Sequence, residues 1–420
     1  MPVLQLLQPF GPRMHYMTGS KLPETRHFSS GSAPNRTRLR ARLLAAFGLL
    51  VLAAFPTSSL AATASVEDGG SGTLFLTYLA GAGEANQVEV SRESEITTIH
   101  DSGAVIVAEA GCLSVDAHTV TCGKADGAFL NVGDLADSLS VADSLGDFFV
   151  EGGAGADALS SCVLCGGTLE GEGGNDSLTG RRLVGGPGND TLSGGPRSDF
   201  LDGGRGNDTF TAGGGNDQII PRSGDDLIDA GAGDDDLLDY DVRGPVTVNL
   251  RTGIATGAGT VTFTGVESVF GSRRGDLLIG DEKANGFSGF EGPDIIRGGR
   301  GADLINGGVE SGGLIRNGTD RLYGGAGNDV LWGENGNDLL VGGLGSDRLF
   351  AGRGDDVAKG EYGNDVLVGG FGSDRLFAGP GDDLLRSRDG RADRVRGQQG
   401  QDRARVDRTL DSVRGVERFF

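Results

Sequence analysis

A repeat of nine residues sets what this chain can fold into. Between Gly324 and Arg386, seven units follow one another without a gap: GGAGNDVLW, GENGNDLLV, GGLGSDRLF, AGRGDDVAK, GEYGNDVLV, GGFGSDRLF and AGPGDDLLR. Each unit has Gly at its fourth place and Asp at its sixth. Six of the seven have a large apolar residue at the eighth place, where the fourth unit has Ala358. So short and strict a period predicts a solenoid, in which each unit packs only against its neighbours.

The two halves of the unit have different conformational preferences. The Gly-rich half adopts positive φ at little cost and turns the chain sharply. The second half is a very short strand, whose middle residue points to one side and whose flanking residues point to the other. We therefore expect outward flanks such as Arg348 and Arg375, and one thin core between coils stacked about 4.8 Å apart. The inward residues of this stretch are Leu331, Leu340, Leu349, Leu367, Leu376 and Leu385.

The sixth-place Asp residues form a ladder of like charges. Two turns per coil put alternate Asp residues on the same edge, one coil apart. Two carboxylates about 5 Å apart repel by roughly 1 kcal/mol in water, and by more where solvent is partly excluded. The ladder therefore needs a cation, and Ca²⁺ fits because it takes about 6–8 oxygen ligands and accepts backbone carbonyls as readily as carboxylates. Mg²⁺ suits shared turns less well, since it demands stricter octahedral geometry and retains water.

Units such as GGAGNDVLW, GGPGNDTLS and GGRGNDTFT resemble the RTX nonapeptide, the hemolysin-type calcium-binding repeat of bacterial proteins. The resemblance implies an all-β fold, a right-handed parallel β-roll in which two repeats make one coil. It also implies that several Ca²⁺ ions lie between the turns of successive coils, held by backbone carbonyls and by the sixth-place Asp. The expected metal ligands are Asp157, Asp176, Asp190, Asp199, Asp208, Asp217, Asp226, Asp235, Asp276, Asp294, Asp303, Asp320, Asp329, Asp338, Asp347, Asp356, Asp365, Asp374 and Asp383.

Composition agrees with a thin repetitive core. The chain has 78 Gly, 1 Trp and 5 Tyr in 420 residues, and Gly without a three-residue period excludes collagen. The net charge of −22 repels nucleic acid and anionic membranes, so we expect neither as a partner. An excess of acids is also typical of solvated or disordered chains. Here the acids are placed by register, which favours the roll.

The N-terminal 1–64 reads as an extension followed by a secretory signal peptide. Arg36, Arg38, Arg40 and Arg42 precede the apolar run Leu43–Phe55. Small residues follow, including Ser59-Leu60-Ala61 and Ala62-Thr63-Ala64, as at a signal cleavage site. A membrane anchor is the rival interpretation, but the 13 apolar residues fall short of the ~20 needed to span a bilayer. We expect an extracellular protein, possible association with the cell surface or matrix, and no membrane span in the mature chain.

Residues 65–130 have β composition without repeats and predict a small β domain that caps the first coil. Expected strands are Thr73–Leu79, Gln87–Val90, Ile96–His100, Ala104–Ala108 and Phe129–Val132. Cys112 and Cys122 are expected to form a disulfide, the default in an exported protein.

The remainder divides into blocks. The first block of the roll spans 131–238, a β spacer with Gly-rich turns at Thr252–Gly259 spans 239–270, two further blocks span 271–386, and an Arg-rich C-terminal cap spans 387–420. The first block includes Cys162 and Cys165, for which a local disulfide or two inert thiols are the expected states, and six clean units between Gly185 and Leu238. Asn285 replaces Asp at one sixth place and weakens a site there, and residues 309–317 read as an inserted loop.

No catalytic motif was found. All four His residues precede the roll, and the chain has no H-E-x-x-H, G-x-S-x-G or G-x-x-x-x-G-K-[ST] motif. The first hypothesis is an exported, non-enzymatic calcium-binding protein whose folding is coupled to Ca²⁺. The second is a surface or matrix structural protein, or an adhesin, that uses the roll as a stalk. An enzyme with a separate catalytic domain is a third reading, which the short 65–130 segment disfavours.

Overall fold

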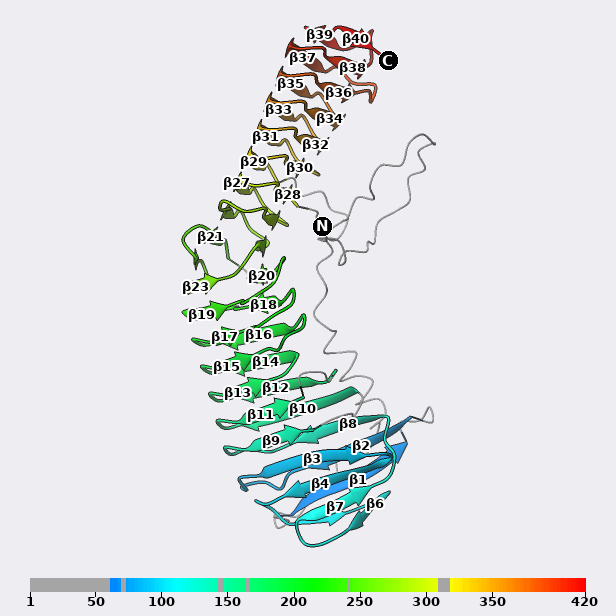
Figure 1. Cartoon of the computed structure of the whole chain (residues 1–420), viewed down its shortest axis with the longest axis vertical. Coiled ribbons are helices and arrows are strands. Elements are labelled where there is room, and N and C mark those ends of the chain that lie inside the picture. Colours follow the sequence, from blue (N-terminus) through cyan, green and yellow to red (C-terminus); the bar gives the residue numbers. More distant parts are fainter. Residues whose placement is uncertain are drawn as a thin grey trace.

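The computed structural model describes residues 61–68, 73–142, 147–162, 166–240, 242, 244–308 and 318–420. These residues form 40 strands and no helix, so this part of the chain holds no helix able to cross a membrane. The strands stack into an elongated all-β roll, with a cap at one end and the C-terminus at the other (Figure 1). The predicted leader at 1–60, the predicted loop at 309–317 and Cys165 lie outside the described residues.

The N-terminal part forms the cap and continues directly into the roll. Its strands are β1 (Ala62–Asp68), β2 (Leu74–Leu79), β3 (Gln87–Glu93), β4 (Ile96–Asp101), β5 (Ile106–Ala108), β6 (Cys112–Ser114), β7 (Thr119–Cys122) and β8 (Gly127–Asn131). β1 pairs antiparallel with β2, and β4 pairs antiparallel with both β3 and β7. β3 and β8 then pair in parallel with the first strands of the roll. β1 starts inside the predicted 1–64 leader, with Ala62 and Ala64 fully buried, so the cap includes the last residues of that range.

Before the spacer, the roll consists of β9 (Ser138–Val141), β10 (Asp147–Ala154), β11 (Ala158–Ser161), β12 (Thr168–Gly173), β13 (Ser177–Thr179), β14 (Arg182–Pro187), β15 (Thr191–Ser193), β16 (Phe200–Arg205), β17 (Thr209–Thr211), β18 (Gln218–Ile220), β19 (Asp226–Asp229) and β20 (Leu237–Asp239). Around the spacer lie β21 (Thr247–Asn249), β22 (Ile254–Thr256), β23 (Thr260–Thr264), β24 (Ser268–Phe270), β25 (Leu277–Ile279), β26 (Gly286–Ser288), β27 (Ile295–Arg300) and β28 (Leu304–Asn306).

The C-terminal coils consist of β29 (Arg321–Ala326), β30 (Val330–Trp332), β31 (Leu339–Leu344), β32 (Arg348–Arg353), β33 (Val357–Tyr362), β34 (Val366–Phe371), β35 (Arg375–Pro380), β36 (Leu384–Ser387), β37 (Arg394–Gln399), β38 (Arg403–Val406), β39 (Ser412–Arg414) and β40 (Arg418–Phe419).

Successive strands alternate between two parallel sheets. From β8 onward, sheet A holds the even-numbered strands to β40 except β22, and sheet B holds the odd-numbered strands from β9 to β39 together with β22. Within a sheet, a strand pairs with the strand one coil later, as Leu349 with Leu367 in sheet A and Ala358 with Leu376 in sheet B. Two nonapeptides therefore make one coil, which confirms the predicted parallel β-roll.

The core is a single row of eighth-place residues from each sheet. All six Leu residues predicted to point inward in the 324–386 stretch are fully buried, and Ala358 is buried in the same row. The predicted outward residues Arg348 and Arg375 are exposed. The alternation follows from strand geometry, since the flanks of an inward residue face the other way.

At the spacer, sheet B contains more strands than sheet A. In sheet A, β20 pairs directly with β24, whereas sheet B inserts the antiparallel meander β21–β22–β23 between β19 and β25. β22 lies within Thr252–Gly259, where the sequence predicted only turns, so that prediction was wrong. The additional strands lengthen one side of the stack only, and the roll changes direction at this level with β19, β21 and β23 on the outer side of the bend (Figure 1).

The roll continues past Arg386, where the sequence predicted only a capping segment. β37 pairs in parallel with β35, and β38 with β36, with Val395 and Ala404 fully buried in the core row. The repeat was not recognised here because successive acids are spaced by 19 residues, as Asp374 to Asp393 and Asp383 to Asp402, and not by 18.

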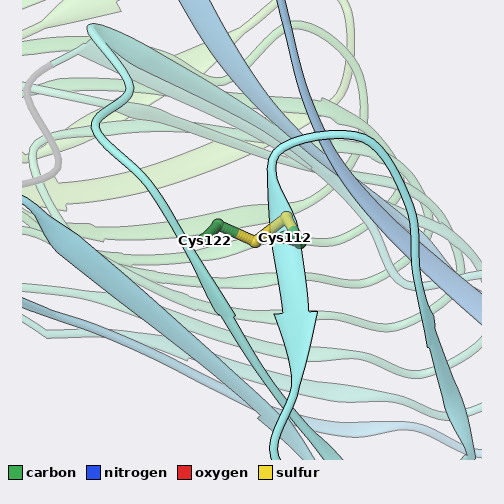
Figure 2. Close-up of a disulfide and its surroundings, with 2 residues drawn as sticks. All are labelled: Cys112 and Cys122. Atoms are coloured by element: carbon green, nitrogen blue, oxygen red, sulfur yellow. A yellow bond between two sulfur atoms is a disulfide. The ribbon is translucent and has the colours of Figure 1, made fainter.

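The two cysteines of the cap are bonded to each other. Cys112 in β6 and Cys122 in β7 are register partners of one antiparallel hairpin, and their sulfurs form a disulfide (Figure 2). The sequence placed no strands at β6 and β7. The bond closes this hairpin against the core that includes Ile99 and Val120.

The core row predicts a strong dependence on single apolar side chains. Because Leu367 is fully buried in a thin core, Leu367→Ala is expected to lower the free energy of unfolding by about 2–5 kcal/mol, measured by urea denaturation in saturating Ca²⁺. Leu344→Ala is the control, because Leu344 is 56% exposed at a turn and its loss is expected to cost no more than about 0.5 kcal/mol. Equal losses for the two variants would contradict the assignment of the core.

Candidate metal centre

Acidic side chains on each edge of the roll link one coil to the next. Oδ1 of Asp347 accepts the backbone N–H of Asp329 at 2.8 Å, and Oδ1 of Asp365 accepts that of Asp347 at 2.8 Å. The same bond repeats along both edges of the roll. The Gly-rich half of each unit places the Asp on the turn, just before its strand, which makes the spacing regular.

We call the two rows ladder A and ladder B, after the sheet whose strands they precede. Ladder A runs through Asp199, Asp217, Asp236, Glu267, Asn285, Asp303, Asp329, Asp347, Asp365, Asp383, Asp402 and Glu417. Ladder B runs through Asp137, Asp157, Asp176, Asp190, Asp208 and Asp226, and after the spacer through Asp276, Asp294, Asp320, Asp338, Asp356, Asp374, Asp393 and Asp411.

The second carboxylate oxygen of most ladder residues has no hydrogen-bond partner in the described structure, although it is buried. A buried polar atom without a partner typically costs about 1–3 kcal/mol, and more when it is charged. Atoms of this kind are Oδ2 of Asp137, Asp157, Asp176, Asp190, Asp208, Asp217, Asp226, Asp236, Asp294, Asp303, Asp329, Asp338, Asp347, Asp356, Asp365, Asp374, Asp383 and Asp393.

These oxygens converge with backbone carbonyls at the first-place glycines. A Cβ added to Gly324 would overlap Oδ2 of Asp329 and would lie 2.7 Å from the carbonyl oxygen of Gly342 in the next coil. The same arrangement recurs at Gly342, with Oδ2 of Asp347 and the carbonyl of Gly360. A carboxylate oxygen and carbonyl oxygens around a space that holds no side chain are the donor set that Ca²⁺ accepts.

The described residues contain no group of three or more His, Cys, Asp or Glu side chains able to hold a metal ion together. Each turn contributes one buried ladder carboxylate, so the further donors to a cation here have to be main-chain carbonyls. Such a donor set favours a hard cation over Zn²⁺, which binds His and Cys side chains.

Burial makes the ladder carboxyls hard to ionise without a cation. It raises the pKa of Asp190, Asp208 and Asp383 to about 7, and that of Asp338 to about 8. Neighbouring carboxylates on the same edge raise these pKa values further, while the hydrogen bond from the preceding coil lowers them. The highest pKa, about 9, belongs to Asp294, which is completely buried.

The structure places all the predicted ligands on the ladders except Asp235. Asp236 takes that place instead, because the chain has one additional residue there and Leu238, not Leu237, fills the core. Asp235 is displaced and accepts a hydrogen bond from the Ser268 hydroxyl. Asp276 is on ladder B, but Ser272 donates to both of its carboxylate oxygens, so it differs from the others.

Sequence reasoning missed four carboxylates of the same kind, at Asp137, Asp236, Asp393 and Asp402. Each is buried and accepts a hydrogen bond from the neighbouring coil. The signal was present in the pattern of Asp two residues before an inward apolar residue, as in Asp393 with Val395 and Asp402 with Ala404. Each of these acids lies 19 or 20 residues from its neighbour on the ladder and not 18, which hid them from a count in nines.

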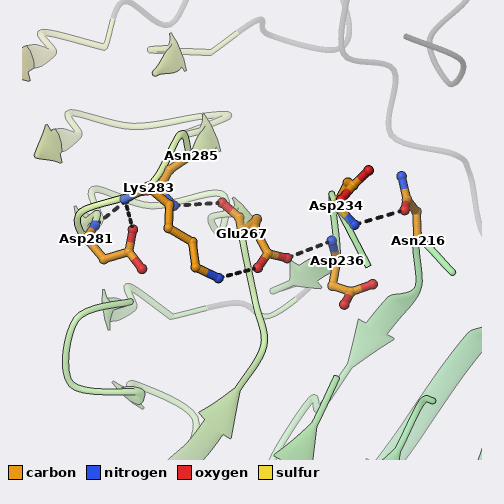
Figure 3. A network of polar contacts seen from close by, with 7 residues as sticks. All are labelled: Asn216, Asp234, Asp236, Glu267, Asp281, Lys283 and Asn285. Atoms are coloured by element: carbon orange, nitrogen blue, oxygen red, sulfur yellow. Dashed lines mark hydrogen bonds and ion pairs between the residues drawn. The ribbon is translucent and has the colours of Figure 1, made fainter. Parts of the chain in front are cut away.

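At two places on ladder A, a basic side chain of the chain itself lies beside the acid. Lys283 Nζ lies 3.0 Å from Oε1 of Glu267, whose other oxygen accepts the backbone N–H of Asp236 (Figure 3). The side-chain amide of Asn285 donates a hydrogen bond to the main-chain carbonyl oxygen of Glu267. Asn285 occupies a ladder position that carries Asp elsewhere, so this position is neutral. At the start of ladder A, Arg181 Nε lies 3.6 Å from Oδ1 of Asp199. An ammonium or guanidinium group thus neutralises these two places without a metal ion.

Comparison with known proteins agrees with this geometry. The RTX calcium-binding nonapeptide repeat matches residues 167–182, 184–219, 222–238, 288–309, 316–349 and 350–385. The roll of this chain is therefore built from RTX calcium-binding nonapeptide repeats and is a calcium-binding β-roll. The matches omit the spacer and the Lys283 region, where the ladder has lost its Asp. No curated protein matches the chain.

The raised pKa values predict that, in the absence of calcium, the folded state becomes less stable as the pH rises. Unfolded Asp has a pKa of about 3.9, whereas Asp190 and Asp383 have folded-state pKa values of about 7. Between about pH 4 and pH 8 the folded state therefore binds more protons than the unfolded state, so its stability falls as pH rises. In excess chelator, circular dichroism is expected to show a larger folded fraction at about pH 5 than at about pH 8. A folded fraction that increased with pH in chelator would contradict this.

The Lys283–Glu267 pair is predicted to stabilise the roll modestly. Lys283→Gln removes the ammonium from a carboxylate that is only 12% exposed, but the Lys itself is 65% exposed and screened by solvent. We expect a loss of about 0.5–1 kcal/mol in urea denaturation at saturating Ca²⁺, decreasing at high salt. Arg251→Gln is the matched control, since its pair with Glu282 is exposed on both sides and its loss is expected to have no measurable effect. A Lys283→Gln variant as stable as the control would show that the pair is not needed.

Proposed function

We propose that this chain is an exported, non-enzymatic calcium-binding protein whose folding is coupled to Ca²⁺. One observation carries the proposal: buried carboxylates repeat on both edges, and most of them have one oxygen bonded to the neighbouring coil and the other without a partner among the described residues. Gathering so many carboxylates opposes folding unless cations compensate them. The unfolded chain keeps the same carboxylates apart and in water.

The coupling follows from mass action. A ligand that binds only the folded state stabilises it by about 2.7 kcal/mol at a concentration of 100 times its dissociation constant. Because sites recur along both ladders, these contributions add. In this proposal, calcium decides whether the coils stack, and the inward Leu, Ile and Phe side chains then fill the core.

Export is supported by the basic and apolar segments that precede Ala62, and by the Cys112–Cys122 disulfide, which suits an oxidising compartment. The absence of a catalytic role is supported by the placement of His100 and His118 in the cap. His100 contacts the Thr119 hydroxyl, and His118 contacts the main-chain oxygens of Asp101 and Ala104. Both contacts are of a structural kind.

The shape of the molecule favours a second candidate, a surface or matrix protein that uses the roll as a stalk. The stack is long and narrow, and its two ends are far apart (Figure 1). A stalk of this kind would become rigid only where calcium is available. Retention of the calcium-loaded protein by cell-wall material, in a pull-down, would favour this candidate over a soluble calcium binder.

Adjacent residues offer a matched test of the calcium sites. Asp356 is fully buried on ladder B, whereas Asp355 occupies the exposed fifth place of the same unit. Asp356→Asn removes the charge but keeps the size and an acceptor oxygen. We expect it to raise several-fold the Ca²⁺ concentration at which half of the chain folds, in a calcium titration followed by circular dichroism and calorimetry. Asp355→Asn removes the same charge and is expected to leave this midpoint nearly unchanged.

The coupling of folding to calcium is tested most directly by removing calcium from the wild-type chain. Excess chelator is expected to unfold residues 185–386, and added Ca²⁺ is expected to restore the fold. A circular dichroism spectrum that chelator does not alter would refute the coupling. Equal shifts for Asp355→Asn and Asp356→Asn would show that net charge, and not the ladder, controls calcium binding.

A further inference from the structure

The last coils carry arginines at neighbouring outward positions. In sheet A, Arg386 is the register partner of Arg405, and Arg403 is the register partner of Arg418. Arg403 and Arg405 also share one face of β38, because their sequence separation of two residues places them on the same side. We call these four exposed residues, Arg386, Arg403, Arg405 and Arg418, the Arg face.

The opposite sheet repeats the pattern. Arg375 is the register partner of Arg394, and Arg396 is the register partner of Arg414. The acids of the same coils do not neutralise these groups, because Asp383, Asp393 and Asp402 are buried on the ladders. Among the described residues, the ion pair found in this region joins Arg388 to Asp407 and involves none of the four residues of the Arg face.

Folding does not require arginine at these positions. At the corresponding outward places, earlier coils have Thr191, Ser193, Thr209 and Thr211 in sheet B, and Gln218 and Val330 in sheet A. Like charges directly opposite one another on neighbouring strands are destabilising, by roughly 1 kcal/mol per pair even in water. The arginines of the Arg face therefore make the roll less stable than Ser or Thr at the same positions would. This indicates that an anion from outside the chain neutralises their positive charge.

The grid of the Arg face fits a repeating anion. Neighbouring strands place guanidinium groups about 4.8 Å apart along the roll, and alternate residues place them about 7 Å apart along a strand. Guanidinium groups bind carboxylates and sulfates through two parallel hydrogen bonds. We propose that the Arg face binds an acidic polysaccharide, a single extended chain of sugars that carry carboxylate or sulfate groups.

The surroundings of the Arg face favour a thin polymer over a broad surface. Acidic turns flank the strands, including Asp382, which is exposed, and Asp407, which is partly exposed. A nucleic-acid duplex or an anionic bilayer is wide enough to meet these carboxylates as well as the arginines. A single sugar chain lying along the strands avoids them.

Single-stranded nucleic acid is disfavoured for a different reason. Proteins bind such strands by stacking bases on exposed aromatic rings. Each of the two rings near the Arg face has a guanidinium group over one side, since Arg403 lies 5.3 Å from the centre of the Phe420 ring and Arg408 lies 5.2 Å from that of Phe419. A base stacked on that side of a ring displaces the guanidinium group.

The test uses the calcium-loaded full chain and a fluorescent heparin oligosaccharide, with affinity measured by anisotropy at low and physiological salt. The chain is expected to bind the oligosaccharide, and Arg403→Gln with Arg405→Gln is expected to weaken binding about tenfold through loss of two charge-assisted contacts. The matched control is Arg321→Gln with Arg348→Gln. It removes the same charge from exposed outward places where the register neighbours are apolar, such as Val330 and Val366 beside Arg348.

Three results would overturn the proposal. These are absence of oligosaccharide binding by the wild-type chain, equal weakening by the two double variants, or tighter binding of a single-stranded oligonucleotide or of phosphatidylserine vesicles. Unchanged circular dichroism and calcium midpoints show that a variant is folded. Should Arg403→Gln with Arg405→Gln fail this check, Arg386→Gln with Arg418→Gln removes the other half of the same face and is held to the same criterion.

Discussion

The two oxygens of most ladder carboxylates have different surroundings, and the roll depends on this difference. One oxygen accepts the backbone N–H of the preceding coil, as in the bond from Asp329 to Asp347, and so holds the spacing between coils. The other is buried beside a main-chain carbonyl and has no donor among the described residues. The first contact stabilises the stack, and the second leaves negative charge without compensation. A cation resolves the conflict because it binds both oxygen types.

The need to place a cation between a buried carboxylate and a main-chain carbonyl also explains the composition of the repeat. A Cβ at the first-place Gly324 would fill the space between the carboxylate and the carbonyl, and five of the seven units between Gly324 and Arg386 have Gly at this place, with Ala351 and Ala378 in the other two. The second-place glycine has a positive φ, 117° at Gly325, where a Cβ would meet the carbonyl of Gly299. Lys283 brings positive charge to Glu267 where the repeat is lost, and Arg181 brings it to Asp199 at the start of ladder A. The spacer thus joins two calcium-binding blocks through contacts made by the protein alone.

Charge is also separated across the thickness of the roll. The acids of the regular units lie on the turns, while the arginines of the last coils lie on the outer faces of the sheets. A net charge of −22 therefore describes the surface poorly, because buried carboxylates contribute much of it and calcium neutralises them in the proposed state. The prediction that nucleic acid and anionic membranes are repelled was drawn from net charge, and the local arrangement of arginine at the C-terminal end leads to the separate proposal of an acidic polysaccharide as partner.

The sequence by itself determined the repeat, the inward row and the place of most ladder carboxylates, since all of these are local and periodic. The pattern of Asp329 with Leu331 needs only the geometry of one turn and one strand. Tertiary structure decided what depends on pairing between coils. Asp236 replaces Asp235, Asp393 and Asp402 extend the ladders, and β22 lengthens sheet B alone. A parallel ladder tolerates an additional residue in a turn as long as the strands keep their register. A count in nines therefore loses the repeat at such a turn, although the hydrogen bonds between coils are still made.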